Sequence, residues 1–154
     1  MLAIRYIDRV NLKESAFLSV LKKYIKELKL ERDISVVFDK RIKGFGSYSY
    51  SLKTQSHIIR INPKNREEQE NGRAGPWEEA DKFNIIATVL HEMYHAHQYE
   101  VRGTSYYNSS FEGVRKITNP GWSEWYSHRE LEARIFEYKN IREAVRYYNS
   151  RCTK

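Results

Sequence analysis

The amino-acid sequence predicts a single α+β domain over residues 1–154, with an N-terminal helix, a small and mostly antiparallel sheet of about three strands, and two later helices. Apolar residues recur at helical spacing near both ends of the chain, whereas three short stretches between residues 34 and 61 are β-branched or alternating. The chain of 154 residues is 40% hydrophobic, which suffices for one core without covalent cross-links.

The first expected element is an amphipathic helix at about residues 12–30. Asn11 and Glu14 have the spacing of a capping box, in which two side chains bond backbone N–H groups at the start of a helix. The apolar side of this helix is expected to face the core. It consists of Leu18, Leu21, Ile25 and Leu28.

Three strands are expected next. "ISVVFD" at 34–39 is rich in β-branched residues, and "SYSYSL" at 47–52 alternates strictly. "SHIIRI" at 56–61 follows a short polar turn, so the last two stretches predict a hairpin. Residues 63–75 are charged and turn-prone and are expected to form a loop.

The next helix is expected to open at Pro76, because proline suits the first helical position. It should run to about Arg102 and stop at Gly103. Residues 103–122 show little pattern and are expected to form a long loop, which is a common place for functional residues.

A last helix should begin between Ser123 and Ser127 and run to about Tyr148. Its apolar residues form one helical stripe that is expected to face the core. The stripe consists of Leu131, Ile135, Tyr138, Ile141 and Val145.

The net charge of +7 is concentrated in residues 1–75, with 16 Lys and Arg against 9 Asp and Glu, whereas residues 76–154 carry 11 of each. A basic excess can attract nucleic acid or acidic proteins, but no DNA-binding motif accompanies it, so a solvated surface is expected rather than a nucleic-acid partner. The single cysteine, Cys152, cannot form an internal disulfide, and no apolar run is long enough to cross a membrane. A cytoplasmic protein is therefore expected.

One short stretch carries a candidate chemistry. "HEMYH" at 91–95 matches the pattern H-E-x-x-H. Residues four apart lie on the same face of a helix, so His91 and His95 can bind one metal ion together. Glu92 lies about 100° around the helix from His91, from where its carboxylate can reach a metal-bound water without being a ligand. Zinc suits imidazole and oxygen ligands and lowers the pKa of bound water to about 7.

The neighbouring polar residues are placed differently on this helix. His97 lies about 200° from His95 and is expected to be structural or exposed. Gln98 shares the ligand face and is expected to line the site, although amides are poor zinc ligands. The alternative to a metal site is a helix with His–Glu pairs or carbonyl-bonded core histidines. The apolar residues that flank the motif favour the metal site, because a buried helix needs a use for two histidines.

Further along the chain, "ELEA" begins at Glu130. "HEMYH" followed by "ELEA" resembles the pattern of the gluzincin metallopeptidases, and most closely the small single-domain minigluzincins and the ImmA/IrrE-type peptidases. The resemblance implies a zincin-like fold and one zinc ion per chain, bound by His91, His95 and Glu130. It also implies that Glu92 is the general base, and that Ala133 is the small residue that lets two helices approach closely.

The resemblance covers about residues 56–138 and has two departures. The gap between His95 and Glu130 is longer than in thermolysin-like members. Arg134 stands where those enzymes carry an aspartate that supports a ligand histidine, so the sequence assigns no residue to that supporting role.

The third protein ligand has alternatives. His128 would make a three-histidine site, and Glu132 is the next carboxylate after Glu130. Glu130 also has the spacing of a capping box with Ser127. The donor to a developing oxyanion is open as well. Its candidates are His128, Tyr106, Tyr107 and Tyr126.

The resemblance implies a zinc metallopeptidase that hydrolyses a peptide or protein substrate, in which Glu92 takes a proton from the water and delivers it to the leaving amine. An edge strand before the motif helix commonly pairs with extended substrate in such enzymes. "SHIIRI" is expected to be that edge, and "SYSYSL" is the other candidate. The alternative function is a zincin-fold binding module with little or no peptidase activity. The retained Glu92 argues against it, because this residue has no evident structural need.

Overall fold

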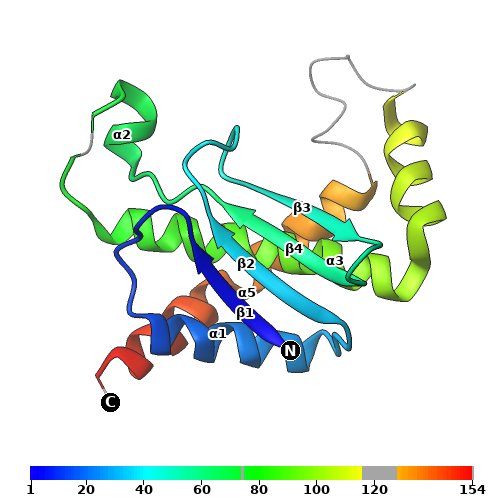
Figure 1. Ribbon diagram of the computed structural model, residues 1–154, viewed down its shortest axis with the longest axis horizontal. Helices are drawn as coiled ribbons and strands as arrows, with labels where there is room; N and C mark the ends of the chain where they lie inside the picture. The colour runs from blue at the N-terminus through cyan, green and yellow to red at the C-terminus, as the bar shows by residue number, and fades with distance from the viewer. Residues whose placement is uncertain (74, 116–127, 154) are drawn as a thin grey trace.

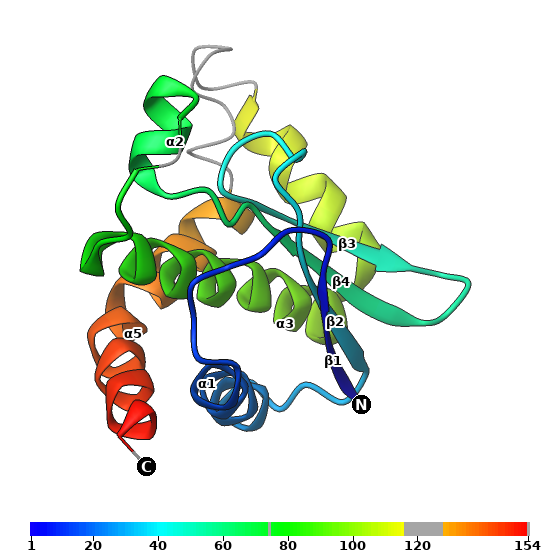
Figure 2. The ribbon, with the colours of Figure 1, turned by 60° about the vertical axis from the view of Figure 1, so that its left-hand side comes forward.

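The structure is a computed structural model that describes residues 1–73, 75–115 and 128–153, and their side chains except those of Arg66 and residues 104–115. A four-stranded mixed sheet carries the long helices on one face (Figure 1, Figure 2). The α+β class predicted from the sequence is therefore confirmed. The strands are β1 (Leu2–Tyr6), β2 (Asp33–Phe38), β3 (Gly46–Ser51) and β4 (Ser56–Ile61). The helices are α1 (Glu14–Glu27), α2 (Arg66–Asn71), α3 (Glu79–Arg115) and α5 (His128–Cys152).

The sheet has the strand order β1-β2-β4-β3, in which β1, β2 and β4 are parallel and only β3 is antiparallel to its neighbour. The expectation of about three, mostly antiparallel strands was wrong. Strand β1 was missed because its residues are only partly buried and include a charged arginine. Without β1, the β1–α1–β2 unit could not be recognised, and such a unit makes a parallel pair.

The hairpin expected between the second and third predicted strands is confirmed, and it forms β3 and β4. The roles of its two strands differ from the expectation, however. β4 lies inside the sheet between β2 and β3, whereas β3 forms an edge. The candidate edge strand is therefore "SYSYSL" and not "SHIIRI". Along β3, Ser47 and Ser49 are exposed while Tyr48 and Tyr50 are partly buried, as the alternation predicts.

Helix α1 is shorter than the predicted range of 12–30, and the expected capping box at its start is wrong. Lys13 occupies the N-cap position without a side-chain cap, and its backbone N–H donates to the Tyr148 hydroxyl at 2.8 Å. The carboxylate of Glu14 instead accepts a hydrogen bond from the Tyr6 hydroxyl at 2.7 Å. A side chain of the distant helix α5 thus accepts the hydrogen bond of a backbone N–H at the start of α1.

The segment expected to be a loop at 63–75 contains the short helix α2. Asn65 caps this helix by accepting a hydrogen bond from the N–H of Glu68 at 2.9 Å, and Gly72 ends it with a φ of 73°. Both residues are ordinary helix-end signals that the charged composition of the segment concealed.

Helix α3 begins at Glu79 rather than at Pro76, and the carboxylate of Asp81 accepts a hydrogen bond from the N–H of Glu78. The predicted break at Gly103 is confirmed, because this residue has a φ of 77° inside the helical run. The backbone beyond it is helical again to Arg115, so the long loop expected at 103–122 is wrong over 104–115. Positions 116–122 lie outside the described residues.

The predicted stripe of α5 is confirmed only in its later part, where Ile141 is buried and Val145 packs against the core. Leu131, Ile135 and Tyr138 are 39%, 53% and 85% exposed. The buried residues are Ala133, Ile141, Ala144 and Tyr148. Ala133 is fully buried, and α5 packs mainly along α3, as expected for a small residue at a close helix contact.

The core lies between the sheet and the helices and draws on α1, β2, β4 and α3. Tyr24, Phe38, Ile59 and Leu90 represent these four elements and are inaccessible to solvent. This packing fixes α3 against the sheet along the turn that carries the histidine motif. None of the described helices combines the length and apolar character of a membrane span.

Candidate metal centre

His91 and His95 lie one turn apart on the buried part of α3. Their side chains are almost inaccessible, with exposed fractions of 9% and 2% for the residues, and their ring centroids lie 4.9 Å apart. Glu92 is 7% exposed. The ligand atoms of these three residues lie within 4.8 Å of one another, so this buried group can hold a metal ion.

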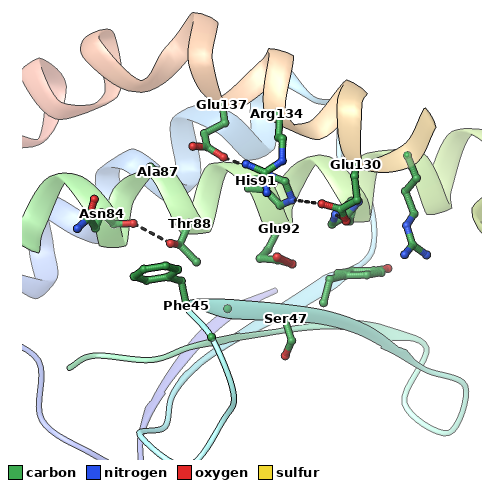
Figure 3. Close-up of a pocket in the computed structure, with 15 residues that line it drawn as sticks. Phe45, Ser47, Asn84, Ala87, Thr88, His91, Glu92, Glu130, Arg134 and Glu137 are labelled. Carbon is green, nitrogen blue, oxygen red and sulfur yellow. Dashed lines mark hydrogen bonds and ion pairs between the residues drawn. The ribbon is translucent and has the colours of Figure 1, made fainter. Parts of the chain in front are cut away.

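Glu130 reaches the two histidines from the first turn of α5. One of its carboxylate oxygens lies 2.9 Å from Nε2 of His91 (Figure 3). The other lies 2.8 Å from Nε2 of His95. The two Nε2 atoms and the carboxylate therefore converge on one point between α3 and α5. The structure brings together the three residues that the sequence proposed as ligands.

Two further side chains hold the other ring nitrogens of the histidines. The carboxylate of Glu137 accepts from Nδ1 of His91 at 3.1 Å, and the amide oxygen of Gln98 accepts from Nδ1 of His95 at 2.8 Å. The Gln98 amide nitrogen donates to the Arg129 carbonyl, which fixes which end of this amide faces His95. Both histidines are thereby oriented with Nε2 toward Glu130.

The supporting role of Glu137 was missed in the sequence, whereas Gln98 was expected to line the site. Glu137 lies seven residues after Glu130, which places both on the same face of α5 two turns apart. That spacing is the only signal from which Glu137 could have been found. Glu137 therefore holds His91 in this structure, a role to which the sequence assigned no residue.

The alternative third ligands are placed elsewhere. Glu132 accepts a hydrogen bond from the Gln98 amide at 2.8 Å and forms an ion pair with Arg102. Its carboxylate therefore helps to hold Gln98, which in turn contacts His95. His128 is exposed at the start of α5. Ser127, the proposed capping partner of Glu130, lies outside the described residues, as do Tyr126 and the side chains of Tyr106 and Tyr107.

His97 has the structural role that its place on the helix predicted. Its Nδ1 lies 3.1 Å from the carbonyl oxygen of Leu28, and its ring packs against Tyr94. These contacts join α3 to the end of α1 on the side of α3 that faces away from His91 and His95.

The site's electrostatics follow from burial and from the convergence of charges. Burial alone would lower the pKa of His91, but the hydrogen bonds to Glu130 and Glu137 outweigh it and raise that pKa to about 9. Burial alone would raise the pKa of Glu130, but the hydrogen bonds from His91 and His95 hold it well below its ordinary value. Glu130 is therefore an anion that stabilises positive charge between α3 and α5.

Glu92 differs from Glu130 in its surroundings. Burial raises the pKa of Glu92 above its ordinary value, and the neighbouring His95 and His91 only oppose that rise. Its carboxylate makes no hydrogen bond or ion pair within the described part of the chain. A carboxylate that folding buries without such a bond is a candidate for a functional role.

A chain of three hydrogen-bonded groups, the buried His57 and the partly buried Tyr48 and Glu100, supports the wall of the site beside His95. The ring of Tyr48 lies 6.3 Å from that of His95, and its hydroxyl donates to Nδ1 of His57 at 2.7 Å. Nε2 of His57 donates to Glu100 at 2.6 Å. Glu100 also accepts from the backbone N–H of Glu31, so this chain links β3, β4, α3 and the segment before β2.

The side chains of His91, Glu92, His95 and Glu130 line a cleft of about 680 Å³ between β3, α3 and α5. Figure 3 shows this cleft. Gly46, at the start of β3, lets the strand come close to the helix: a Cβ added there would lie 2.4 Å from Cγ2 of Thr88. The same atom would lie 3.5 Å from Cγ of Glu92. The edge strand thus approaches α3 beside the residue proposed as the base.

Comparison of the chain with protein-family models, with curated proteins and with solved structures finds no match. What the site can do is therefore inferred from its own residues and their geometry.

Proposed function

We propose that the protein is a zinc-dependent metallopeptidase in which His91, His95 and Glu130 bind one zinc ion per chain. The observation that carries the proposal is the carboxylate of Glu130, which lies within 2.9 Å of both Nε2 atoms although it is 35 residues from the motif. Two imidazoles and one carboxylate are a donor set of catalytic zinc sites, which keep a fourth position for water or substrate.

The bound zinc would polarise the substrate carbonyl and make water nucleophilic at neutral pH. Glu92 lies next to His91 and makes no hydrogen bond or ion pair with another described side chain, so it is placed to accept the proton from that water. Its raised pKa supports this role, because a base that holds its proton more tightly accepts it more readily and can then pass it to the leaving amine.

The supporting residues keep the ligand set in position during this reaction. Glu137 and Gln98 hold the Nδ1 atoms of His91 and His95, so both Nε2 atoms stay directed toward Glu130. Such outer hydrogen bonds fix the tautomer and orientation of a ligand histidine.

The edge strand β3 supports a peptide as the substrate. β3 pairs with β4 on one side only, and residues from Gly44 to Tyr48 line the cleft. The backbone N–H and C=O groups of an edge strand can pair with an extended peptide that lies across the metal site. A substrate held in this way would be a flexible segment rather than a folded surface.

The proposal is tested by removing and restoring the metal. Zinc-supplied protein should cleave members of a peptide library, a chelator should abolish cleavage, and added zinc should restore it, with products identified by mass spectrometry. Peptide binding without cleavage in the zinc-loaded protein would instead support the alternative of a binding module. Cleavage that a chelator leaves unchanged would contradict the zinc mechanism.

A further inference from the structure

Phe45 is a large aromatic side chain at the mouth of the cleft. It lies directly before β3 and is 55% exposed. Figure 3 shows it on the strand side of the cleft, facing Asn84 and Thr88 on α3. Its ring makes no aromatic contact within the described part of the chain, so folding leaves about half of an apolar group in water.

The backbone that presents Phe45 is firmly held, in contrast to its side chain. The N–H of the buried Asn62 donates to the Phe45 carbonyl at 2.8 Å, and the Asn62 amide donates to the carbonyls of Gly44 and Ile42 at 3.2 and 3.4 Å. Gly44 has a φ of 74°, which disfavours other residues there. The buried Asn62 thus holds the turn and fixes the position of the Phe45 backbone beside the cleft.

The two ends of the cleft differ in chemistry. Beside Phe45 the lining includes the methyl-bearing Ala87 and Thr88, and the hydroxyl of Thr88 donates to the Asn84 carbonyl within its own helix. The α5 side carries the charged side chains of Arg129, Glu130, Arg134 and Glu137. The space between Phe45 and α3 is therefore a favourable place for an apolar group of a ligand.

From this placement, we infer that Phe45 is the specificity-determining residue of the cleft and that its end of the cleft binds a large apolar side chain of an extended peptide. The inference rests on the proposed function in one respect, that an extended peptide lies along β3 beside Glu92, and it requires neither zinc nor cleavage. Burying the exposed face of the ring against an apolar side chain is worth roughly a tenfold change in affinity.

The test compares two short, end-blocked peptides of alanine and serine that differ only in one central residue, phenylalanine or serine. Their binding to zinc-supplied Glu92→Gln protein is measured by calorimetry, because this variant should not cleave them. The phenylalanine peptide should bind about tenfold more tightly. Phe45→Ala should remove that difference, Phe45→Leu should keep most of it, and the control Leu52→Ala should keep all of it. Leu52 is a suitable control because it is 79% exposed on the same hairpin and does not line the cleft.

Equal binding of the two peptides, binding of neither, or a preference that survives in Phe45→Ala would each overturn the inference. Melting curves of the variants separate loss of folding from loss of the preference. A preference that depends on Phe45 in a protein whose wild type neither holds zinc nor cleaves peptides would overturn the proposed function and leave the inference standing.

Discussion

Glu130 and Glu132 are two residues apart on α5, yet their carboxylates meet different partners. Glu130 contacts the Nε2 atoms of both motif histidines, whereas Glu132 contacts Gln98 and Arg102. Residues two apart on a helix point about 200° apart. A single turn of α5 therefore provides both a candidate ligand, Glu130, and a hydrogen-bond acceptor for Gln98, Glu132. The sequence motif alone could not distinguish these roles.

The first prediction concerns these two glutamates. Glu130→Ala should weaken zinc binding far more than Glu132→Ala, because the first removes a proposed ligand and the second removes only a partner of Gln98. Zinc affinity is measured by competition with a chromophoric chelator at neutral pH. Glu132→Ala is the matched control, and a larger effect in that variant would move the third ligand.

Glu137 is the residue whose function the sequence did not indicate. Glu137→Gln should weaken zinc binding by roughly 10- to 100-fold, because the Nδ1 atom of His91 would lose its anionic acceptor. Isothermal titration with zinc measures this effect. The control is Glu143→Gln, which alters an exposed carboxylate further along the same helix. Equal zinc affinity in the Glu137→Gln and wild-type proteins would mean that His91 does not depend on this support.

Among the elements, the edge strand β3 comes close to the motif helix α3 at Gly46. Gly46 has no room for a side chain, because a Cβ there would lie 2.4 Å from the Thr88 side chain. Gly46→Ala should therefore push β3 away from α3 and destabilise the protein by about 1–3 kcal/mol.

Denaturant unfolding of Gly46→Ala measures this cost, and Ser47→Ala, an exposed change on the same strand, is the control. If peptide cleavage occurs, it should fall in Gly46→Ala more than stability alone explains, because β3 carries the proposed substrate edge. An unchanged midpoint in Gly46→Ala would show that strand and helix do not meet as described.

The chain of Tyr48, His57 and Glu100 makes stability depend on pH. Burial lowers the pKa of His57 below its ordinary value of 6.5, and the hydrogen bond to Glu100 opposes this only in part. The unfolded chain therefore takes up a proton on His57 before the folded protein does. The stabilisation is fully present above pH 6.5 and is lost as the pH falls toward the folded pKa.

This effect is measured by denaturant unfolding of the metal-free protein between about pH 7 and pH 5. The wild type should lose more stability over this range than His57→Gln, which keeps a polar group but does not titrate. Besides Tyr48 and Glu100, the groups near His57 are Tyr50, Tyr99 and the cation of Arg32. Equal slopes in the two proteins would contradict the assignment of a neutral, buried His57.

At the scale of the whole molecule, the sequence predicted what depends on local pattern. The helix with "HEMYH", its break at Gly103 and the hairpin of β3 and β4 follow from neighbouring residues and are confirmed. The parallel pairing of β1 with β2 depends on contacts between residues about thirty positions apart, and nothing local in "LAIRY" announces it. The sheet was therefore predicted with one strand too few and as mostly antiparallel, although β1, β2 and β4 are parallel.

The error in α5 has a different cause. Its inward face carries Glu130 and Glu137 beside Ala133, so the residues that contact the motif histidines occupy the positions where a hydrophobic stripe was sought. The apolar stripe that was chosen instead is exposed at Leu131 and Ile135. The expectation that the inward face of a helix is apolar fails where polar side chains of a site lie on that face.

In the proposed mechanism, Glu92 acts as the base beside a zinc ion held by His91, His95 and Glu130. The most direct measurement compares wild type with Glu92→Gln, both supplied with zinc, for metal content per chain and for cleavage of one peptide library. About one zinc per chain in both proteins, with cleavage by the wild type alone, is the predicted result. Absence of zinc from both proteins, or undiminished cleavage by Glu92→Gln, would contradict this mechanism.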